Sequence, residues 1–144
     1  RGCTNFKLRQ MLRSVARLYD AEIGKAGLKA TQYSLLAYVA MLGPIQPAEL
    51  ARNLGMDAST LSRNLRPLID HGWLVQRPGA DARSRLIEIT AEGQAKRLEA
   101  RRHWKRAQAE LTEKLGEDRV QALHLLIDEG LERLGPQDAP RAEA

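Results

Sequence analysis

The sequence predicts a mainly α-helical protein with a small β-hairpin, and three observations support this fold class. Apolar residues recur at spacings of three and four over most of the chain, as in amphipathic helices. A short helix, a Gly-containing turn and a second helix are expected near the middle of the chain, which predicts a helix-turn-helix. Two short runs of strand-forming residues follow directly and predict a hairpin. The combination is a winged helix-turn-helix flanked by further helices.

Length and composition are those of an ordinary globular protein. The chain has 144 residues, of which 43% are hydrophobic and 28% charged, enough to bury a core in one domain or two small lobes. The net charge of +5 is compatible with an anionic partner such as nucleic acid. Residues 116–144 are acidic, in contrast to the basic segments before them. This end is therefore expected to face away from a polyanion.

The first part of the chain predicts two helices. Apolar residues at helical spacing predict the first from about residue 4 to residue 25, and Gly27 is expected to end it. Thr31 is expected to cap the second, which continues to Leu42 before a Gly-Pro pair.

The next segment predicts the helix-turn-helix. Pro47 is typical of the first turn of a helix, and Gly55 is typical of its end. Asp57 is expected to cap a second helix that runs from Ala58 to about His71.

This second helix is expected to have one apolar and one polar face. Its buried stripe comprises Leu61, Leu65, Leu68 and Ile69. Its exposed side chains are Ser59, Thr60, Ser62, Arg63 and Arg66. Hydroxyl and guanidinium groups bond to phosphates and base edges, and arginine can form a bidentate pair with guanine. A helix face that only contacts water has a similar composition, so this alternative stays open for the segment alone.

Pro67 departs from the pattern of this helix, because proline removes one hydrogen bond and crowds the carbonyl of Arg63. We expect a bend after the exposed first turns, which remain straight. The alternative is a helix that ends near Arg66 and starts again.

Two short strands are predicted at residues 73–75 and 86–89, with Pro78 and Gly79 opening the turn between them. Because this hairpin follows the helix-turn-helix directly, it is interpreted as a wing.

Three charged residues, Asp81, Arg83 and Arg85, lie at the tip of the predicted wing. A protruding tip with two arginines can reach the negative minor groove next to the major groove that the helix occupies. Asp81 is expected to form an ion pair with the arginine two residues on and to hold it ready for DNA. On an isolated hairpin these side chains would simply be solvated, but beside a helix-turn-helix they favour DNA contact.

Residues 47–93, PAELARNLGMDASTLSRNLRPLIDHGWLVQRPGADARSRLIEITAEG, resemble the core of the MarR family of bacterial transcription regulators. The family's Asp-x-Arg wing pattern is matched by Asp81 and Arg83, and TQYSLLAYV resembles the family's second helix. Pro67 and Ala82, beside the wing arginine, depart from the family pattern. The resemblance extends to about Leu134 and implies an obligate homodimer on a pseudo-palindromic operator in double-stranded DNA.

The chain after residue 90 predicts two more helices, one of about 25 residues from Thr90 and another after Gly116. Their apolar stripes exceed what a small winged domain needs to cover itself. A homodimer interface is expected, with an intramolecular bundle as the alternative. The predicted organisation is dimerisation segments at 1–30 and 91–135, a DNA-binding domain at 31–90 and a disordered tail at 136–144.

Two modes of regulation are expected for a repressor of this kind. A small aromatic or carboxylate ligand between the dimerisation helices and the winged domain would contact Arg13, Arg17, Tyr19, Tyr33, Tyr38 and Trp104, although each also fits an ordinary structural role. The alternative is oxidation of Cys3, which lies about two residues upstream of the position used by the family's peroxide-sensing branch. Its basic neighbours Arg1, Lys7 and Arg9 favour a reactive thiolate, yet a lone cysteine near a terminus is often incidental.

Other function classes fit less well. A single cysteine excludes an intrachain disulfide and a multi-cysteine metal site, so a reducing cytoplasm is expected. No signal peptide is visible, and the charge-free stretch 30–48 is too interrupted by Gly and Pro to cross a membrane. The three histidines lack metal-ligand spacing and no nucleophile or phosphate-binding motif is present, so neither an enzyme nor a cofactor is expected. A non-specific architectural nucleic-acid-binding protein is the remaining alternative.

Overall fold

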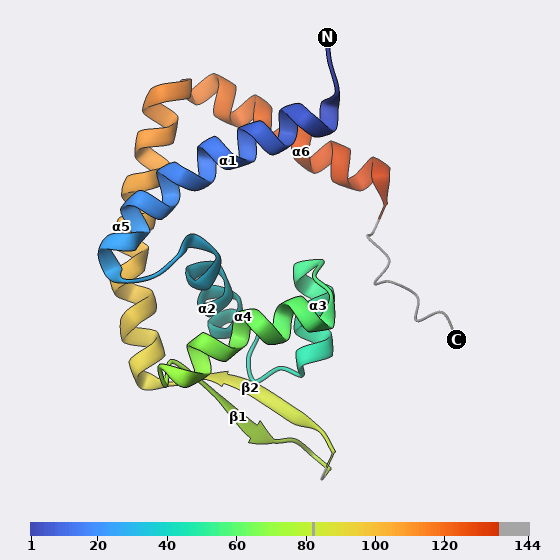
Figure 1. Cartoon of the computed structure of the whole chain (residues 1–144), viewed down its shortest axis with the longest axis vertical. Helices are drawn as coiled ribbons and strands as arrows, with labels where there is room; N and C mark the ends of the chain where they lie inside the picture. The colour runs from blue at the N-terminus through green and yellow to red at the C-terminus, as the bar shows by residue number, and fades with distance from the viewer. Residues whose placement is uncertain (82, 136–144) are drawn as a thin grey trace.

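The computed structural model of this chain describes residues 1–81 and 83–135 and confirms a mainly helical fold with a two-stranded hairpin (Figure 1). The helices are α1 Thr4–Ile23, a 3-10 turn η1 Gly24–Ala26, α2 Ala30–Leu42, α3 Pro47–Leu54, α4 Ala58–Asp70, α5 Ala91–Leu115 and α6 Glu117–Leu134. The strands are β1 Leu74–Pro78 and β2 Arg85–Ile89. Ala82 and the predicted tail at 136–144 lie outside the described residues.

The elements form two connected parts. Figure 1 shows α2, α3, α4 and the hairpin at one end and α1 and α6 at the other, with α5 running between them. β1 and β2 pair antiparallel, with Leu74 opposite Ile89 and Pro78 opposite Arg85. The core of the winged part is apolar, because it contains the fully buried side chains of Leu36, Leu50, Leu61, Leu68, Leu74 and Ile87.

The start of α2 differs from the prediction. The helix begins at Ala30, and its cap position is Lys29 rather than Thr31. The Lys29 amide donates to the Gln32 side chain over 2.9 Å, and the Ala30 amide donates to Asp20 Oδ1 over 2.7 Å. The predicted Thr31 cap is wrong because a carboxylate from α1 and a glutamine one turn into α2 already bind the free amides.

α4 is one continuous helix across Pro67, so the alternative of a break near Arg66 is wrong. Gly72 has a φ of 75°, and the Trp73 amide donates to the Leu68 carbonyl over 3.0 Å. The Trp73 amide is therefore used to close the C-terminal end of α4. As a result, β1 begins at Leu74, one residue later than predicted.

α5 joins the two ends of the molecule through polar contacts with the end of α1. Lys96 donates to the Ala26 carbonyl over 2.8 Å, and His103 Nδ1 lies 3.2 Å from Glu22 Oε1. Among the described residues, Glu22 is the charged residue that is buried, and hydrogen bonds from Lys25 and then from His103 lower its pKa. α1 is thereby held on the same long helix that carries the wing.

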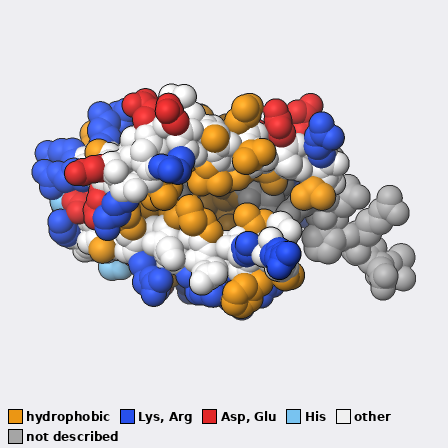
Figure 2. All heavy atoms as spheres, turned by 90° about the horizontal axis from the view of Figure 1, so that it is seen from above, with side chains coloured by type: hydrophobic (Ala, Val, Ile, Leu, Met, Phe, Trp, Pro, Cys, Tyr) orange, Lys and Arg blue, Asp and Glu red, His pale blue; other side chains and the backbone are white. Residues whose placement is uncertain are grey.

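α6 contains no buried residue in the single chain. Its exposed apolar side chains are Leu125, Leu126, Ile127, Leu131 and Leu134, and those of the first half of α1 are Phe6, Leu8 and Leu12. Figure 2 looks onto this end of the molecule and shows hydrophobic side chains gathered in the middle, with charged side chains around them. Among the described residues, no helix is long and apolar enough to span a membrane.

Candidate nucleic-acid interface

Helices α3 and α4 meet at a tight turn that has the predicted features. Pro47 begins α3, and Gly55 ends it with a φ of 61°, a left-handed conformation that favours glycine. The Met56 amide donates to the Ala51 carbonyl over 2.9 Å and closes the end of α3. Asp57 then caps α4, as predicted, and the helix leaves the turn with its first residues at the surface.

Asp57 holds the first turn of α4 with both carboxylate oxygens. Oδ1 accepts from the Thr60 amide and from the Ser59 hydroxyl, each over 2.7 Å. Oδ2 accepts from the Thr60 hydroxyl over 2.9 Å. The Thr60 amide and then the two hydroxyls stabilise the charged carboxylate and lower the pKa of Asp57 to about 2. The carboxylate is therefore ionised at neutral pH.

This cap predicts an acid-dependent loss of stability. Because the pKa of Asp57 in the folded protein is about 2 and its usual value is 3.8, the ionic part of the cap is present above about pH 4 and is lost toward pH 2. We expect the difference in free energy of unfolding between wild type and Asp57→Ala to shrink over this range, as measured by urea unfolding. A difference that stays constant down to about pH 2 would contradict a role for the charge.

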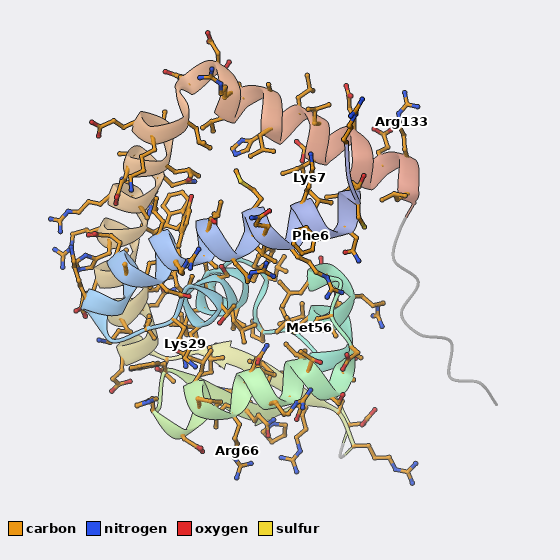
Figure 3. The ribbon with its side chains drawn as sticks, turned by 45° about the horizontal axis from the view of Figure 1, so that its top comes forward. Phe6, Lys7, Lys29, Met56, Arg66 and Arg133 are labelled. Carbon is orange, nitrogen blue, oxygen red and sulfur yellow. The ribbon has the colours of Figure 1, made fainter. Side chains whose placement is uncertain are left out.

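The outward face of α4, here called the recognition helix, carries the side chains predicted to contact DNA. Ser59, Ser62, Arg63 and Arg66 are exposed and Thr60 is half-buried. The Arg63 guanidinium lies 3.5 Å from the Thr60 hydroxyl. Arg66 points away from the body of the protein (Figure 3), and its Nε lies 3.4 Å from Asp70 Oδ1. Asp70 was not predicted from the sequence, although a spacing of four residues on a helix indicates such a pair.

The wing closes through a turn in which only glycine fits at its first residue. The Gly79 amide donates to the Ser84 carbonyl over 2.9 Å. A Cβ at Gly79 would overlap the Ser84 hydroxyl and lie 2.9 Å from the Ser84 Cβ. Because Gly79 and Ser84 lie so close together, the two strands meet here, and the residues between Gly79 and Ser84 form the tip of the wing.

Asp81 does not make the predicted contact. Its Oδ1 accepts from the backbone amides of Arg83 and Ser84, each over 2.9 Å, and the described residues contain no Asp81–Arg83 ion pair. These amides, that of Arg83 first, lower the pKa of Asp81. The ion-pair prediction is wrong because a short aspartate side chain binds the amides two and three residues on and shapes the turn itself. The Arg83 side chain is left exposed.

The wing presents three arginines in all. Arg83 and Arg85 are exposed, as predicted. Arg77, which was not predicted from the sequence, lies on β1, and its Nε is 2.6 Å from Glu88 Oε2 on β2. Figure 1 shows that the wing and the recognition helix lie at the same end of the molecule, away from α1 and α6.

Comparison with known proteins identifies this arrangement. A model of the MarR family matches residues 26–84, from the 3-10 turn to the wing. The multiple antibiotic resistance protein MarR of Salmonella typhimurium is 31% identical over 115 residues, which cover 77% of this chain and 78% of that protein. The chain belongs to the MarR family. It is a DNA-binding transcription regulator and not an enzyme.

Other relatives and solved structures agree with MarR-family membership. The transcriptional regulator YwoH of Bacillus subtilis is 29% identical over 90 residues, which cover 62% of this chain and 66% of that protein. The regulator MosR of M. tuberculosis, solved in complex with DNA, is 32% identical with a TM-score of 0.78, covering 92% of this chain and 98% of that one. A mutant MarR from E. coli, solved with operator DNA, is 26% identical with a TM-score of 0.81, covering 88% and 92%.

The aromatic residues predicted to bind an effector in this MarR-family chain do not line one pocket. Tyr33 and Trp104 pack together at the core, with ring centroids 6.3 Å apart, and burial raises the pKa of Tyr33. Tyr38 is exposed on the outside of α2. These three side chains are accounted for by packing and surface position.

Tyr19 and Arg17 line two separate hollows on different faces of α1, because two residues turn a helix by about 200°. Tyr19 borders a cavity of about 380 Å³ between α1 and the helix-turn-helix, on whose other side Met56 lies (Figure 3). The Tyr19 hydroxyl bonds to Gln108 of α5. Arg17 borders a hollow of about 510 Å³ between α1 and α5. Arg13 is exposed, one turn before Arg17.

Cys3 is exposed and lies directly before α1. Its carbonyl accepts from the Lys7 amide over 3.1 Å, which begins the helix. No group of three His, Cys, Asp or Glu side chains within the described ranges is arranged to hold a metal ion.

Proposed function

We propose that this protein is a homodimeric repressor that binds a pseudo-palindromic DNA operator and is released by a small ligand. The observation that carries the proposal is the exposed row of hydroxyl and guanidinium groups on α4, with the wing arginines at the same end of the molecule. An α-helix of this kind fits the major groove, where each base pair presents a distinct pattern of donors and acceptors. The wing then reaches the adjacent minor groove.

The two sets of arginines have different roles in this proposal. Arg63 and Arg66 on α4 face base edges and phosphates, and Arg63 is suited to a bidentate contact with guanine. Arg83 and Arg85 on the wing supply positive charge to the narrow minor groove, whose negative potential does not require a particular base contact. Asp81 supports this second role by folding the turn that exposes Arg83.

Arg63→Ala is expected to reduce discrimination between the operator and scrambled DNA by about tenfold, because it removes a base-edge contact. Fluorescence anisotropy with both duplexes over a range of salt concentrations measures this discrimination.

Arg83→Ala is the matched comparison. It should weaken binding to both duplexes and reduce the slope of log affinity against log salt by about one. If the Arg63→Ala variant still discriminates fully between operator and scrambled DNA, Arg63 does not read a base. If the Arg83→Ala variant keeps the salt slope of wild type, the wing does not contact DNA through Arg83.

A second copy of this chain is the proposed partner of the apolar side chains on α1 and α6. These residues are exposed in the single chain, and hydrophobic side chains gather at this end of the molecule (Figure 2). A two-fold axis at this end would direct two recognition helices toward half-sites about one helical turn apart. The domain organisation follows: residues 1–30 and 91–135 dimerise, and residues 31–90 bind DNA.

The cavity beside Tyr19 is the proposed effector site. It lies between α1, which belongs to the dimerisation part, and the α3–α4 turn, which belongs to the DNA-binding part. Its lining is mostly apolar, with Thr31, Ser34 and Asn64 as polar groups, which suits a small aromatic ligand. A ligand that fits only one spacing of these two parts would shift the protein away from the DNA-bound form.

Oxidation of Cys3 is the alternative trigger, and it requires an accessible thiol such as this one. If Cys3 is the switch, hydroperoxide should lower the affinity of wild type for DNA by tenfold or more, on the order of other allosteric couplings, and leave Cys3→Ser unaffected. Fluorescence anisotropy on the DNA upstream of the protein's own gene measures this. Equal binding by reduced, oxidised and Cys3→Ser protein would exclude the redox switch and favour the cavity.

A further inference from the structure

The recognition helix begins with two hydroxyl groups that share one carboxylate. Ser59 and Thr60 are both candidates for DNA contact, and both donate a hydrogen bond to Asp57, over 2.7 Å and 2.9 Å. A hydroxyl group has a single proton and two lone pairs. An ionised carboxylate only accepts hydrogen bonds, so both hydroxyl groups must be the donors. The low pKa of Asp57 keeps the carboxylate ionised at neutral pH.

The two hydroxyl oxygens therefore have no proton left for another partner while the contact to Asp57 lasts. Towards DNA they can only accept hydrogen bonds. Phosphate oxygens also only accept, so these hydroxyls cannot bond to the DNA backbone. The negative charge of Asp57 in the same turn further disfavours close approach to a phosphate. Among base edges in the major groove, only the amino groups of adenine and cytosine donate.

We propose that Asp57 sets the hydrogen-bond polarity of the recognition helix, so that Ser59 and Thr60 read the amino groups of adenine or cytosine in the major groove. This inference rests on the proposed function, since it assumes that α4 lies in the groove. Asp57 is a positioning residue here, because it acts on DNA through the two hydroxyls. As a result, the start of the helix presents hydrogen-bond acceptors to DNA, and the arginines further along the helix present donors.

Two neighbouring side chains support this division. The Thr60 oxygen accepts from Arg63 over 3.5 Å, so Thr60 relays the orientation set by Asp57 to the first arginine of the helix. Ser62 is exposed on the same helix and outside the Asp57 cluster. Its hydroxyl keeps its proton and can donate to a phosphate. A hydroxyl group outside the Asp57 cluster, such as that of Ser62, can therefore donate to DNA, whereas those of Ser59 and Thr60 can only accept.

Asp57→Asn separates this inference from a purely structural role of the cap. Asparagine is as good a cap as aspartate, so its Oδ1 can still accept from the Thr60 amide and from Ser59. The other carboxylate oxygen is replaced by an amide NH₂, which donates. The Thr60 hydroxyl must then accept from Asn and turn its proton outward, while Ser59 keeps its polarity. The substitution thus reverses one of the two hydroxyls.

The experiment is selection of bound sequences from a library of random DNA duplexes, with wild type, Asp57→Asn and Asp118→Asn. Wild type should select adenine or cytosine at the strand positions that face Ser59 and Thr60. Asp57→Asn should remove the need for an amino group at one of these positions, so that guanine and thymine, whose keto oxygens accept, are also selected there, and should leave the other position unchanged. Asp118→Asn makes the same carboxylate-to-amide change in the first turn of α6, so it is the matched control and should keep both preferences. Thermal unfolding of each variant verifies that the helix is intact.

A second measurement tests the contact directly on the selected duplex. Replacing the contacted adenine by purine, which lacks the amino group, should weaken binding of wild type by about two- to tenfold, as expected for one neutral hydrogen bond. Against Thr60→Val or Ser59→Ala, whichever faces that base, the same replacement should have no additional effect.

The outcomes distinguish failure of the proposed function from failure of the polarity set by Asp57. If wild type selects no sequence, the proposed function fails. If wild type selects a sequence and Asp57→Asn selects the same one, the function stands and the polarity set by Asp57 is overturned. Equal loss of affinity on purine-substituted DNA by wild type and the hydroxyl-deleted variants overturns it as well.

Discussion

Gly93→Ala is expected to destabilise the protein by about 3 kcal/mol or more, because the added methyl group has no space against the backbone. Gly93 lies in the first turn of α5, directly against the end of the recognition helix. A Cβ there would overlap the Trp73 carbonyl oxygen and lie 2.8 Å from Ile89 Cγ1. Backbone atoms cannot rotate away as a flexible side chain can, so α5 would have to separate from the winged part. Urea unfolding measures the loss.

The contact that Gly93 permits is held by Thr90. The Thr90 hydroxyl donates to the Gly72 carbonyl over 2.6 Å and accepts from the Gly93 amide over 3.0 Å. Gly24→Ala is the matched control, because Gly24 has an ordinary helical conformation with nothing near its Cβ position. It should be neutral or stabilise by less than about 1 kcal/mol. Equal stability of the two variants would show that α5 does not dock through Gly93.

Leu126→Glu is expected to separate the proposed dimer and to lower operator affinity by about a hundredfold or more, because each half-site would then be bound without its linked partner. Leu126 is 67% exposed in the single chain, so its side chain has room for the substitution unless a second copy covers it. Sedimentation equilibrium should show the mass fall from that of a dimer to 16.1 kDa.

Met41→Glu is the control for this change. Met41 is also an exposed apolar residue on a helix, at 69%, but it lies on α2 in the winged part, outside the segments proposed to dimerise. It should leave the mass of a dimer unchanged. A wild-type protein that is already monomeric at micromolar concentration, or a dimeric Leu126→Glu variant, would refute the α1–α6 interface.

The elements that follow local rules were predicted from the sequence. Gly55 and Asp57 mark the turn between α3 and α4, because a left-handed residue and a helix cap each depend on a few neighbouring residues. The apolar stripe of α4 follows from helical periodicity alone: Leu61, Leu65 and Leu68 are buried, and Ile69, also predicted to be buried, is half-buried. The same local information supported the 25-residue helix after Thr90.

The errors lie where a distant residue or a backbone group competes for a polar atom. Thr31 does not cap α2, because the first amide of this helix, that of Ala30, already donates to Asp20, ten residues earlier in the chain. Charge alone predicts an ion pair between Asp81 and the Arg83 side chain, whereas the Asp81 carboxylate accepts from the nearby Arg83 amide instead. Tyr19 and Arg17 were assigned to one pocket, although α1 is covered by different helices on its two faces.

The sequence by itself determined the helical periodicity, the turn residues and the composition of the DNA-facing helix, because these depend on side-chain chemistry and spacing along the chain. Only the tertiary structure decided how α5 docks on Trp73 through Gly93, which side chains of α1 border which hollow, and which apolar residues of α1 and α6 remain uncovered. Such contacts join residues far apart in the chain, and their geometry depends on the packing of whole helices rather than on local preference.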